Sequence, residues 1–244
     1  MKNNFFKVLL PIVFWCFIWQ IGAMAVDNVF LLPDIPSTLS AFFSLFKSPT
    51  FYKVVFLSAL RVILGLSLGC IVGTALAILC HKFTIISSLV TPIITVIKST
   101  PVASFIIVLW VLLSGDALSI FIGFLMVMPI IWQNLIDGYN AIDFQLTEVA
   151  EIFEFSFKKR LKILILPTLK DYFIPAIITA SGLAWKAEIA AEIIAYTKNS
   201  IGQGINDAKY NMETATVFAW TLVIILLSIM LEYATRQLLR RSVK

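Results

Sequence analysis

Six long apolar runs constrain the fold of this 244-residue chain more than any other feature. A helix needs roughly 20 apolar residues, at about 1.5 Å each, to cross the hydrocarbon core of a bilayer. Runs of that kind extend over Val8 to Val26, Val54 to Cys80, Ile85 to Leu113, Ala117 to Ile136, Phe173 to Ala195 and Ala215 to Thr235. Each must be helical, because an open strand leaves backbone groups unpaired in lipid. The runs predict an all-α polytopic membrane protein with six transmembrane helices, in which residues 1–244 form a single domain.

The composition agrees with this class. Hydrophobic residues make up 60% of the chain, charged residues only 14%, and the mean hydropathy is +0.95. A soluble domain, a disordered chain and a nucleic-acid-binding protein are therefore disfavoured. Three cysteines and one histidine offer little for redox or metal chemistry, and the adjacent pair Cys80 and His81 lacks the spacing of a zinc site. We expect no metal and no cofactor.

Two features indicate how the helices are shaped and packed. The third run holds Pro92 and Pro101, which predict a kinked or two-part helix. The second run carries small residues at four-residue spacing, which favour close helix packing within the bundle over a contact between subunits. These residues are Gly65, Gly69, Gly73 and Ala77.

The basic residues set an expected orientation. Twelve Lys and Arg residues lie on the side of the two termini and four on the other side. Because cytoplasmic loops are enriched in such residues, we expect both termini in the cytoplasm of a bacterial plasma membrane protein. The first run, which ends near Ala23-Met24-Ala25, also fits a cleaved leader, but it is long enough to remain as an anchor.

The longest hydrophilic stretch, Asp137 to Asp171, has the pattern of a helical hairpin. Asp143 can cap a helix that presents two stripes, followed by a basic run. The apolar stripe is Val149, Ile152, Phe153 and Ser156, the acidic stripe is Glu148, Glu151 and Glu154, and the basic run is Lys158, Lys159, Arg160 and Lys162. The apolar stripe must be covered by lipid, by the rest of the chain or by a partner protein.

Here the residues resemble a known family. The run Glu148-Val149-Ala150, then Ser156 and Leu166-Pro167, resembles the EAA loop of ABC importer permeases. That pattern reads E-A-A, a glycine four residues after the final alanine, and a later L-P. Val149 replaces the middle alanine, and Glu154 stands at the usual glycine, so the turn between the two short helices of the loop must form without glycine.

The resemblance extends over residues 58–205 and points to the nitrate/sulfonate/taurine type of permease. Similar residues occur at Pro101, Trp110, Pro129, Asn134, Gly138, Asp143, Pro175, Gly182-Leu183-Ala184-Trp185 and Ala191-Glu192. The resemblance implies the fold of type I ABC importer permeases. It also implies a small polar or anionic solute, moved by alternating access.

The same resemblance implies partners and a coupling site. Two permease subunits pair, as a homodimer or with a second permease, two cytoplasmic ATPases dock on their loops, and an extracytoplasmic binding protein delivers solute. Residues 143–167 are then the coupling loop, with residues 147–156 as its coupling helix. Its implied ATPase contacts are Glu148, Val149, Ala150, Glu151, Phe153, Glu154, Ser156, Leu166 and Pro167. The sequence has no G-x-x-x-x-G-K-[ST] motif, so we expect no ATP hydrolysis by this chain itself.

Ionisable groups within apolar runs are costly and usually face a cavity or a partner. Lys98, Lys186, Glu188 and Glu192 are such groups. Helical spacing places the two glutamates on one face and Lys186 on roughly the opposite face. They are pathway candidates together with Pro101 and Trp185, with the glutamates as counter-charges to the lysines; an interhelical ion-pair network is the other interpretation. Arg61 lies near the outer end of its run, where we expect it to snorkel to the interface.

Two other classes remain as alternatives. A secondary transporter or channel without an ATPase partner would need inverted repeats or an ion site of its own. A membrane-embedded enzyme would need a polar cluster of catalytic groups. Neither feature is evident in the sequence.

Overall fold

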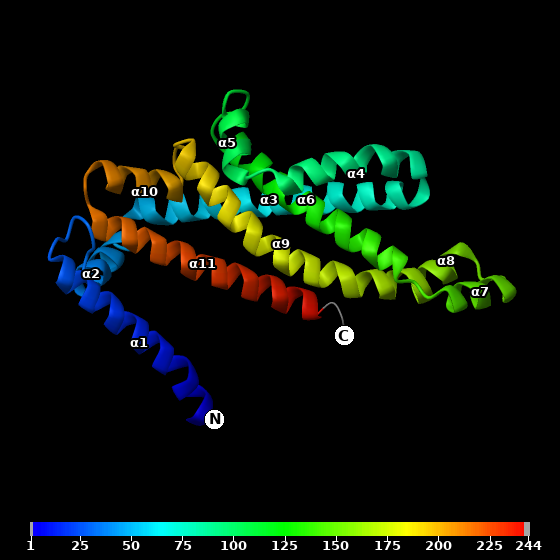
Figure 1. The fold of residues 1–244 in the computed structure, drawn as a ribbon, viewed down its shortest axis with the longest axis horizontal. Helices are drawn as coiled ribbons and strands as arrows, with labels where there is room; N and C mark the ends of the chain where they lie inside the picture. The colour runs from blue at the N-terminus through cyan, green and yellow to red at the C-terminus, as the bar shows by residue number, and fades with distance from the viewer. Residues whose placement is uncertain (1, 242–244) are drawn as a thin grey trace.

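The computed structural model describes residues 2–241, all of whose regular structure is helical. Figure 1 shows these helices as an elongated bundle, with α7 and α8 projecting at one end. In chain order they are α1 (Lys2–Val26), α2 (Ile35–Leu45), α3 (Pro49–Lys82), α4 (Thr84–Ser99), α5 (Val102–Trp110), α6 (Asp116–Asn140), α7 (Phe144–Ile152), α8 (Phe157–Arg160), the π-helix η1 (Leu161–Ile165), α9 (Leu166–Ile194), α10 (Ile201–Tyr210) and α11 (Thr214–Arg241).

The predicted spans are found in the structure. Within the described residues, α1, α3, α6, α9 and α11 are long and apolar enough to cross a membrane, and α4 with α5 forms one further pair bent by 101°. The two-part third helix is therefore confirmed. The break falls at Pro101, because the preceding Thr100 is extended and cannot continue the helix, whereas Pro92 is accommodated inside α4.

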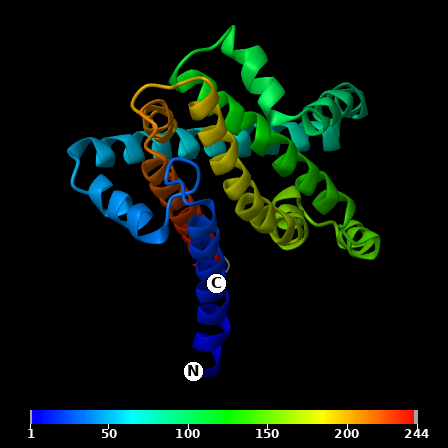
Figure 2. The ribbon, with the colours of Figure 1, turned by 60° about the vertical axis from the view of Figure 1, so that its left-hand side comes forward.

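The core of the bundle is the packing of α3, α6 and α9. Along α3, the backbone of α6 approaches so closely that only glycine fits. A Cβ atom at Gly69 would lie 2.5 Å from the Cβ of Val127, and one at Gly73 would lie 2.8 Å from the carbonyl oxygen of Met128. The small residues of the second run therefore serve packing within the chain, as predicted. Figures 1 and 2 show α1 directed away from this core.

The apolar runs did not predict the helices α2 and α10, because neither helix is long enough to cross a bilayer. The first, α2, begins at the N-cap Asp34, whose carboxylate accepts a hydrogen bond from the backbone N–H of Ser37 at 3.1 Å. Bonds from Ser37 lower the pKa of Asp34 below its ordinary value. The second, α10, begins at Ser200, whose hydroxyl accepts from the N–H of Gln203 at 2.9 Å. Both helices lie at the opposite end of the bundle from α7 and α8 (Figure 1).

Candidate functional site

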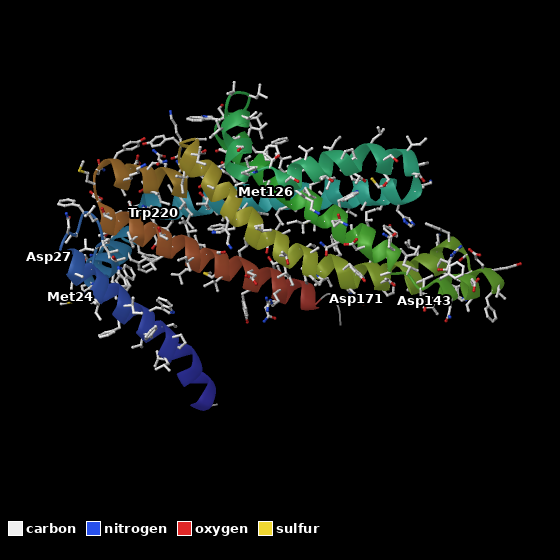
Figure 3. All side chains as sticks on the ribbon, viewed as in Figure 1. Met24, Asp27, Met126, Asp143, Asp171 and Trp220 are labelled. Carbon is white, nitrogen blue, oxygen red and sulfur yellow. The ribbon has the colours of Figure 1, made fainter. Side chains whose placement is uncertain are left out.

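The segment of residues 143–167 joins α6 to α9 and projects beyond the bundle (Figure 1). Its first helix, α7, begins as predicted at Asp143 (Figure 3), whose carboxylate accepts a hydrogen bond from the N–H of Gln145 at 2.8 Å. The helix ends at Ile152, four residues earlier than the expected coupling helix of residues 147–156. The single stripe expected from Val149 to Ser156 is therefore interrupted by a turn.

Glu154 makes that turn with a left-handed backbone, at a φ of 48°. The N–H of Phe155 bonds to the carbonyl oxygen of Ala150 and the N–H of Glu154 bonds to that of Glu151, both at 2.9 Å. This pair of bonds is a Schellman motif, in which glycine normally occupies the position of Glu154. The turn therefore forms without glycine and holds a side chain in a conformation that costs free energy.

Beyond the turn, the second half of the segment folds back on the first. Nη2 of Arg160 lies 3.1 Å from Oε1 of Glu151, and Nζ of Lys159 lies 3.7 Å from the centre of the Phe155 ring. These contacts show that two residues of the basic run hold the hairpin together.

The apolar side chains of α7 are largely uncovered. Ala150 is buried, but Ile152 is 77% exposed and Phe153 is 70% exposed, and Val149 and Phe144 are exposed as well. Large apolar groups exposed side by side mark a surface that another molecule covers. The acidic residues Glu148, Glu151 and Glu154 are also exposed, and Ser156 begins α8. Leu166 and Pro167 lie apart from this surface, in a groove against α3 and α6.

A buried charge network lies at the other end of the bundle. Arg61 of α3 pairs with Glu192 of α9 at 2.9 Å and with Asp116 of α6 at 2.7 Å. Its guanidinium also donates to the carbonyl oxygens of Lys198 and Asn199. The expectation that Arg61 snorkels to the interface was wrong, because its side chain is only 5% exposed.

The same network caps α10. Oε2 of Glu192 accepts hydrogen bonds from Oγ of Ser58 at 2.9 Å and from the N–H of Gly202 at 3.2 Å. The Ser58 hydroxyl oxygen accepts from the N–H of Ile201 at 3.0 Å. The first N–H groups of α10, which have no partner within the helix, are thus satisfied by α3 and α9. Nearby, the Tyr196 hydroxyl donates to Asp207, which raises the pKa of that phenol.

The ionisable pathway candidates differ in burial, because the two glutamates are buried and the two lysines are exposed. Glu188 and Glu192 share a buried face of α9 and Lys186 is exposed on another face, as the helical spacing predicted. Glu188 packs against Gly65 and Gly123, and neither of its carboxyl oxygens has a hydrogen-bond partner. Lys98 is exposed near the end of α4. Within the described residues neither lysine forms an ion pair, so the glutamates are not their counter-charges in this chain.

The two other pathway candidates are now located. Pro101 is exposed at the break between α4 and α5. Trp185 is 2% exposed, and its indole N–H donates to the carbonyl oxygen of Ile224 in α11 at 3.1 Å. Trp185 thus packs in the core between α9 and α11 and does not line a surface open to solute. This position corrects the expectation that Trp185 lines the solute pathway.

A bundle with this set of spans and an exposed helical segment between its fourth and fifth spans defines a polytopic helical membrane protein. Residues 65–244 match the family described as binding-protein-dependent transport system inner membrane component. The chain belongs to this family and is the permease component of an ABC importer, a multi-pass protein of the inner membrane.

Individual relatives and solved structures agree with this assignment. The chain is 25% identical, over 97% of its own length and 86% of the other, to SsuC of Bacillus subtilis (strain 168), which is named for aliphatic sulfonate transport. It is 29% identical to the bicarbonate transport system permease protein CmpB of Synechococcus elongatus, over 62% of this chain and 55% of CmpB.

Two solved structures show the fold. An inward-facing structure of the MetNI methionine ABC transporter has a TM-score of 0.64 at 13% identity, covering 79% of this chain and 95% of that one. An amino acid ABC transporter crystallised with histidines has a TM-score of 0.62 at 14% identity, covering 78% of this chain and 91% of that one. The predicted type I importer fold is confirmed.

Proposed function

We propose that this chain is one of two paired permease subunits that form the solute pathway of an importer driven by ATPase subunits. In this proposal the ATPases dock on residues 143–167 in the cytoplasm, and both termini lie on that side. A binding protein delivers solute to the opposite end, where α2 and α10 lie. This chain itself hydrolyses no ATP.

The exposed apolar surface of α7 is the observation that carries this proposal. Val149, Ile152 and Phe153 are exposed on a segment that extends beyond the bundle (Figure 1), so the rest of the described residues 2–241 does not cover them. Their acidic neighbours Glu148 and Glu151 add polar contacts at the edge of the same surface. An apolar centre with a charged rim is typical of a protein–protein interface.

We further propose that the solute is a small anion. The names of SsuC and CmpB assign aliphatic sulfonates and bicarbonate to those relatives, and both solutes are small anions. Lys98 and Lys186 are exposed on this chain, so they can face a pathway between two subunits and attract an anion. Uptake should then fall when Lys186 is replaced by Met, and unchanged uptake would remove Lys186 from the pathway.

Affinity purification of the tagged chain from its native membranes tests ATPase docking. Phosphate release by the eluate measures the ATPase that remains bound. The substitutions Glu148→Lys and Phe153→Asp should each remove most of this activity, while Glu213→Lys, the same charge reversal at the far end of the bundle, should leave it unchanged. Full ATPase recovery with both loop variants would show that the ATPase docks elsewhere.

A further inference from the structure

The helix α4 presents three different faces around its axis. Its core face packs against the rest of the bundle and consists of Ile86, Val90, Ile94 and Ile97. A second, apolar face is exposed and consists of Ile85, Leu89, Ile93 and Val96. A third face, here called the hydroxyl face, is also exposed and consists of Thr84, Ser88, Thr91, Thr95, Lys98 and Ser99. The spacing of three or four residues within each set keeps its members on one side of the helix.

One environment does not suit both exposed faces. The helix α4 is part of a broken membrane span and lies at the edge of the bundle, beside α3 (Figure 1). Lipid covers the apolar face readily, because acyl chains are as apolar as leucine. The hydroxyl face includes Lys98, whose ammonium group forms no ion pair within the described residues 2–241. A charge of this kind is costly in hydrocarbon, so it requires water or an anion nearby.

The backbone of α4 gives a second reason for water on this face. Pro92 lies inside the helix and has no N–H group to donate to the carbonyl oxygen of Ser88, four residues earlier. A carbonyl without an amide donor is costly in lipid, unless a side chain or water donates to it. Because Ser88 belongs to the hydroxyl face, water on that face can reach its carbonyl oxygen.

The hydroxyl groups have hydrogen-bond partners within the helix itself. Oγ1 of Thr91 donates to the carbonyl oxygen of Ser87 at 2.7 Å, and Oγ1 of Thr95 donates to that of Thr91 at 2.9 Å. Ser88 and Ser99 make the same bond to the residue four positions before them. Each hydroxyl can rotate its proton from the carbonyl toward an anion. A row of such groups can hold an anion weakly at each step, as passage through a membrane requires.

We propose that the hydroxyl face of α4 lines a water-filled solute pathway, in which its hydroxyl groups and Lys98 bind the anionic solute in succession. The apolar exposed face stays in contact with lipid. This inference rests on the proposed function, because the pathway between paired permease subunits supplies the water and the solute. It adds to Lys98 a row of hydroxyl groups that extends over about 20 Å of the helix.

Cysteine labelling in broken native membranes tests where water reaches α4. Thr91→Cys and Thr95→Cys place a thiol on the hydroxyl face. Ile93→Cys and Val96→Cys are the matched variants on the apolar exposed face. The reagent is sulfonatoethyl methanethiosulfonate, an anion that reacts with thiols in water, and peptide mass spectrometry follows each cysteine separately. We expect the hydroxyl-face cysteines to react at least about tenfold faster, because the anion is costly to place in hydrocarbon.

A second comparison tests the contribution of Lys98. The sulfonate reagent and its cationic analogue, trimethylammonioethyl methanethiosulfonate, are each applied to Thr95→Cys. Lys98→Gln should lower the ratio of the anionic rate to the cationic rate about tenfold, because Lys98 lies one helical turn from this thiol. Lys198→Gln removes the same charge from an exposed position between α9 and α10 and should leave the ratio unchanged.

Three results would overturn the proposal. The first is equal labelling of the two exposed faces, and the second is an equal effect of the two lysine variants on the rate ratio. The third is a hydroxyl face whose cysteines do not react, because lipid or a second copy of this chain would then cover it.

The labelling requires neither ATP nor uptake, so it can fail separately from the proposed function. A chain that imports solute with ATP while its hydroxyl face stays unlabelled would contradict only this inference. A labelled face that favours the anion, in a chain whose uptake needs no ATP, would support the pathway and contradict only the ATPase-driven part of the proposed function.

Discussion

Nη1 of Arg61 lies 2.9 Å from Oε1 of Glu192, and both side chains are buried where α3, α9 and α10 meet. One helical turn deeper, Glu188 is buried against Gly65 and has no hydrogen-bond partner. The two glutamates therefore lie on the same face of α9, but only Glu192 has a positively charged partner. Glu192 belongs to a network that joins three helices, whereas Glu188 is surrounded by packed backbone.

This contrast predicts different outcomes for the same substitution at the two positions. Glu192→Gln should lower the free energy of unfolding by about 3 kcal/mol, because Arg61 loses a buried anionic partner. Glu188→Gln should change it by less than about 1 kcal/mol, because no pairing is lost. Unfolding in mixed micelles, followed by circular dichroism, measures both. Similar losses at the two positions would contradict the structural distinction between them.

The close contact of α3 with α6 predicts a second pair of outcomes. Gly69→Ala should destabilise the fold by about 1 to 3 kcal/mol, because its Cβ would lie 2.5 Å from that of Val127. Gly182→Ala adds a Cβ that meets nothing within 4 Å and should stabilise α9 by about 0.5 to 1 kcal/mol. Thermal unfolding in detergent compares them. If Gly69→Ala were as stable as the native chain, α3 and α6 would not pack this closely.

The left-handed backbone of Glu154 predicts that glycine improves the turn. Glu154→Gly should stabilise the end of α7 by about 1 kcal/mol, since glycine adopts a positive φ without a steric cost. Hydrogen exchange of the α7 amides should then slow by about fivefold. Gln145→Gly, within the same helix, should instead speed exchange. Faster exchange in Glu154→Gly would show that the turn has another conformation.

Much of the fold could be predicted from the sequence, because the length and the apolar composition of a segment identify it as a membrane span. The six apolar runs, the two-part third helix and the close packing of Gly65, Gly69 and Gly73 all followed from local pattern. The short helices α2 and α10 did not, since neither is long enough to cross a bilayer. Their caps, Asp34 and Ser200, were the available signals.

An interhelical ion-pair network was one of the two expectations for Glu192, but the part of Arg61 in it was missed, although the spacing of Arg61 was present in the sequence. Arg61 lies four residues before Gly65, so it continues the packed face of α3 by one turn, and a residue on that face cannot reach the interface. The partner of Glu192 could not be derived, because it depends on which helices become neighbours. Likewise, the groove at Leu166 and Pro167 depends on how α9 meets α3 and α6, which no local pattern specifies.

Transport in reconstituted vesicles tests the central claim most directly. The chain is incorporated into liposomes with its ATPase and binding protein, and uptake is measured for the solute that copurifies with the binding protein. The proposal predicts uptake only when both ATP and the ATPase are present, and loss of most uptake with Glu148→Lys. Solute uptake into vesicles that contain this chain alone, without ATP, would contradict it.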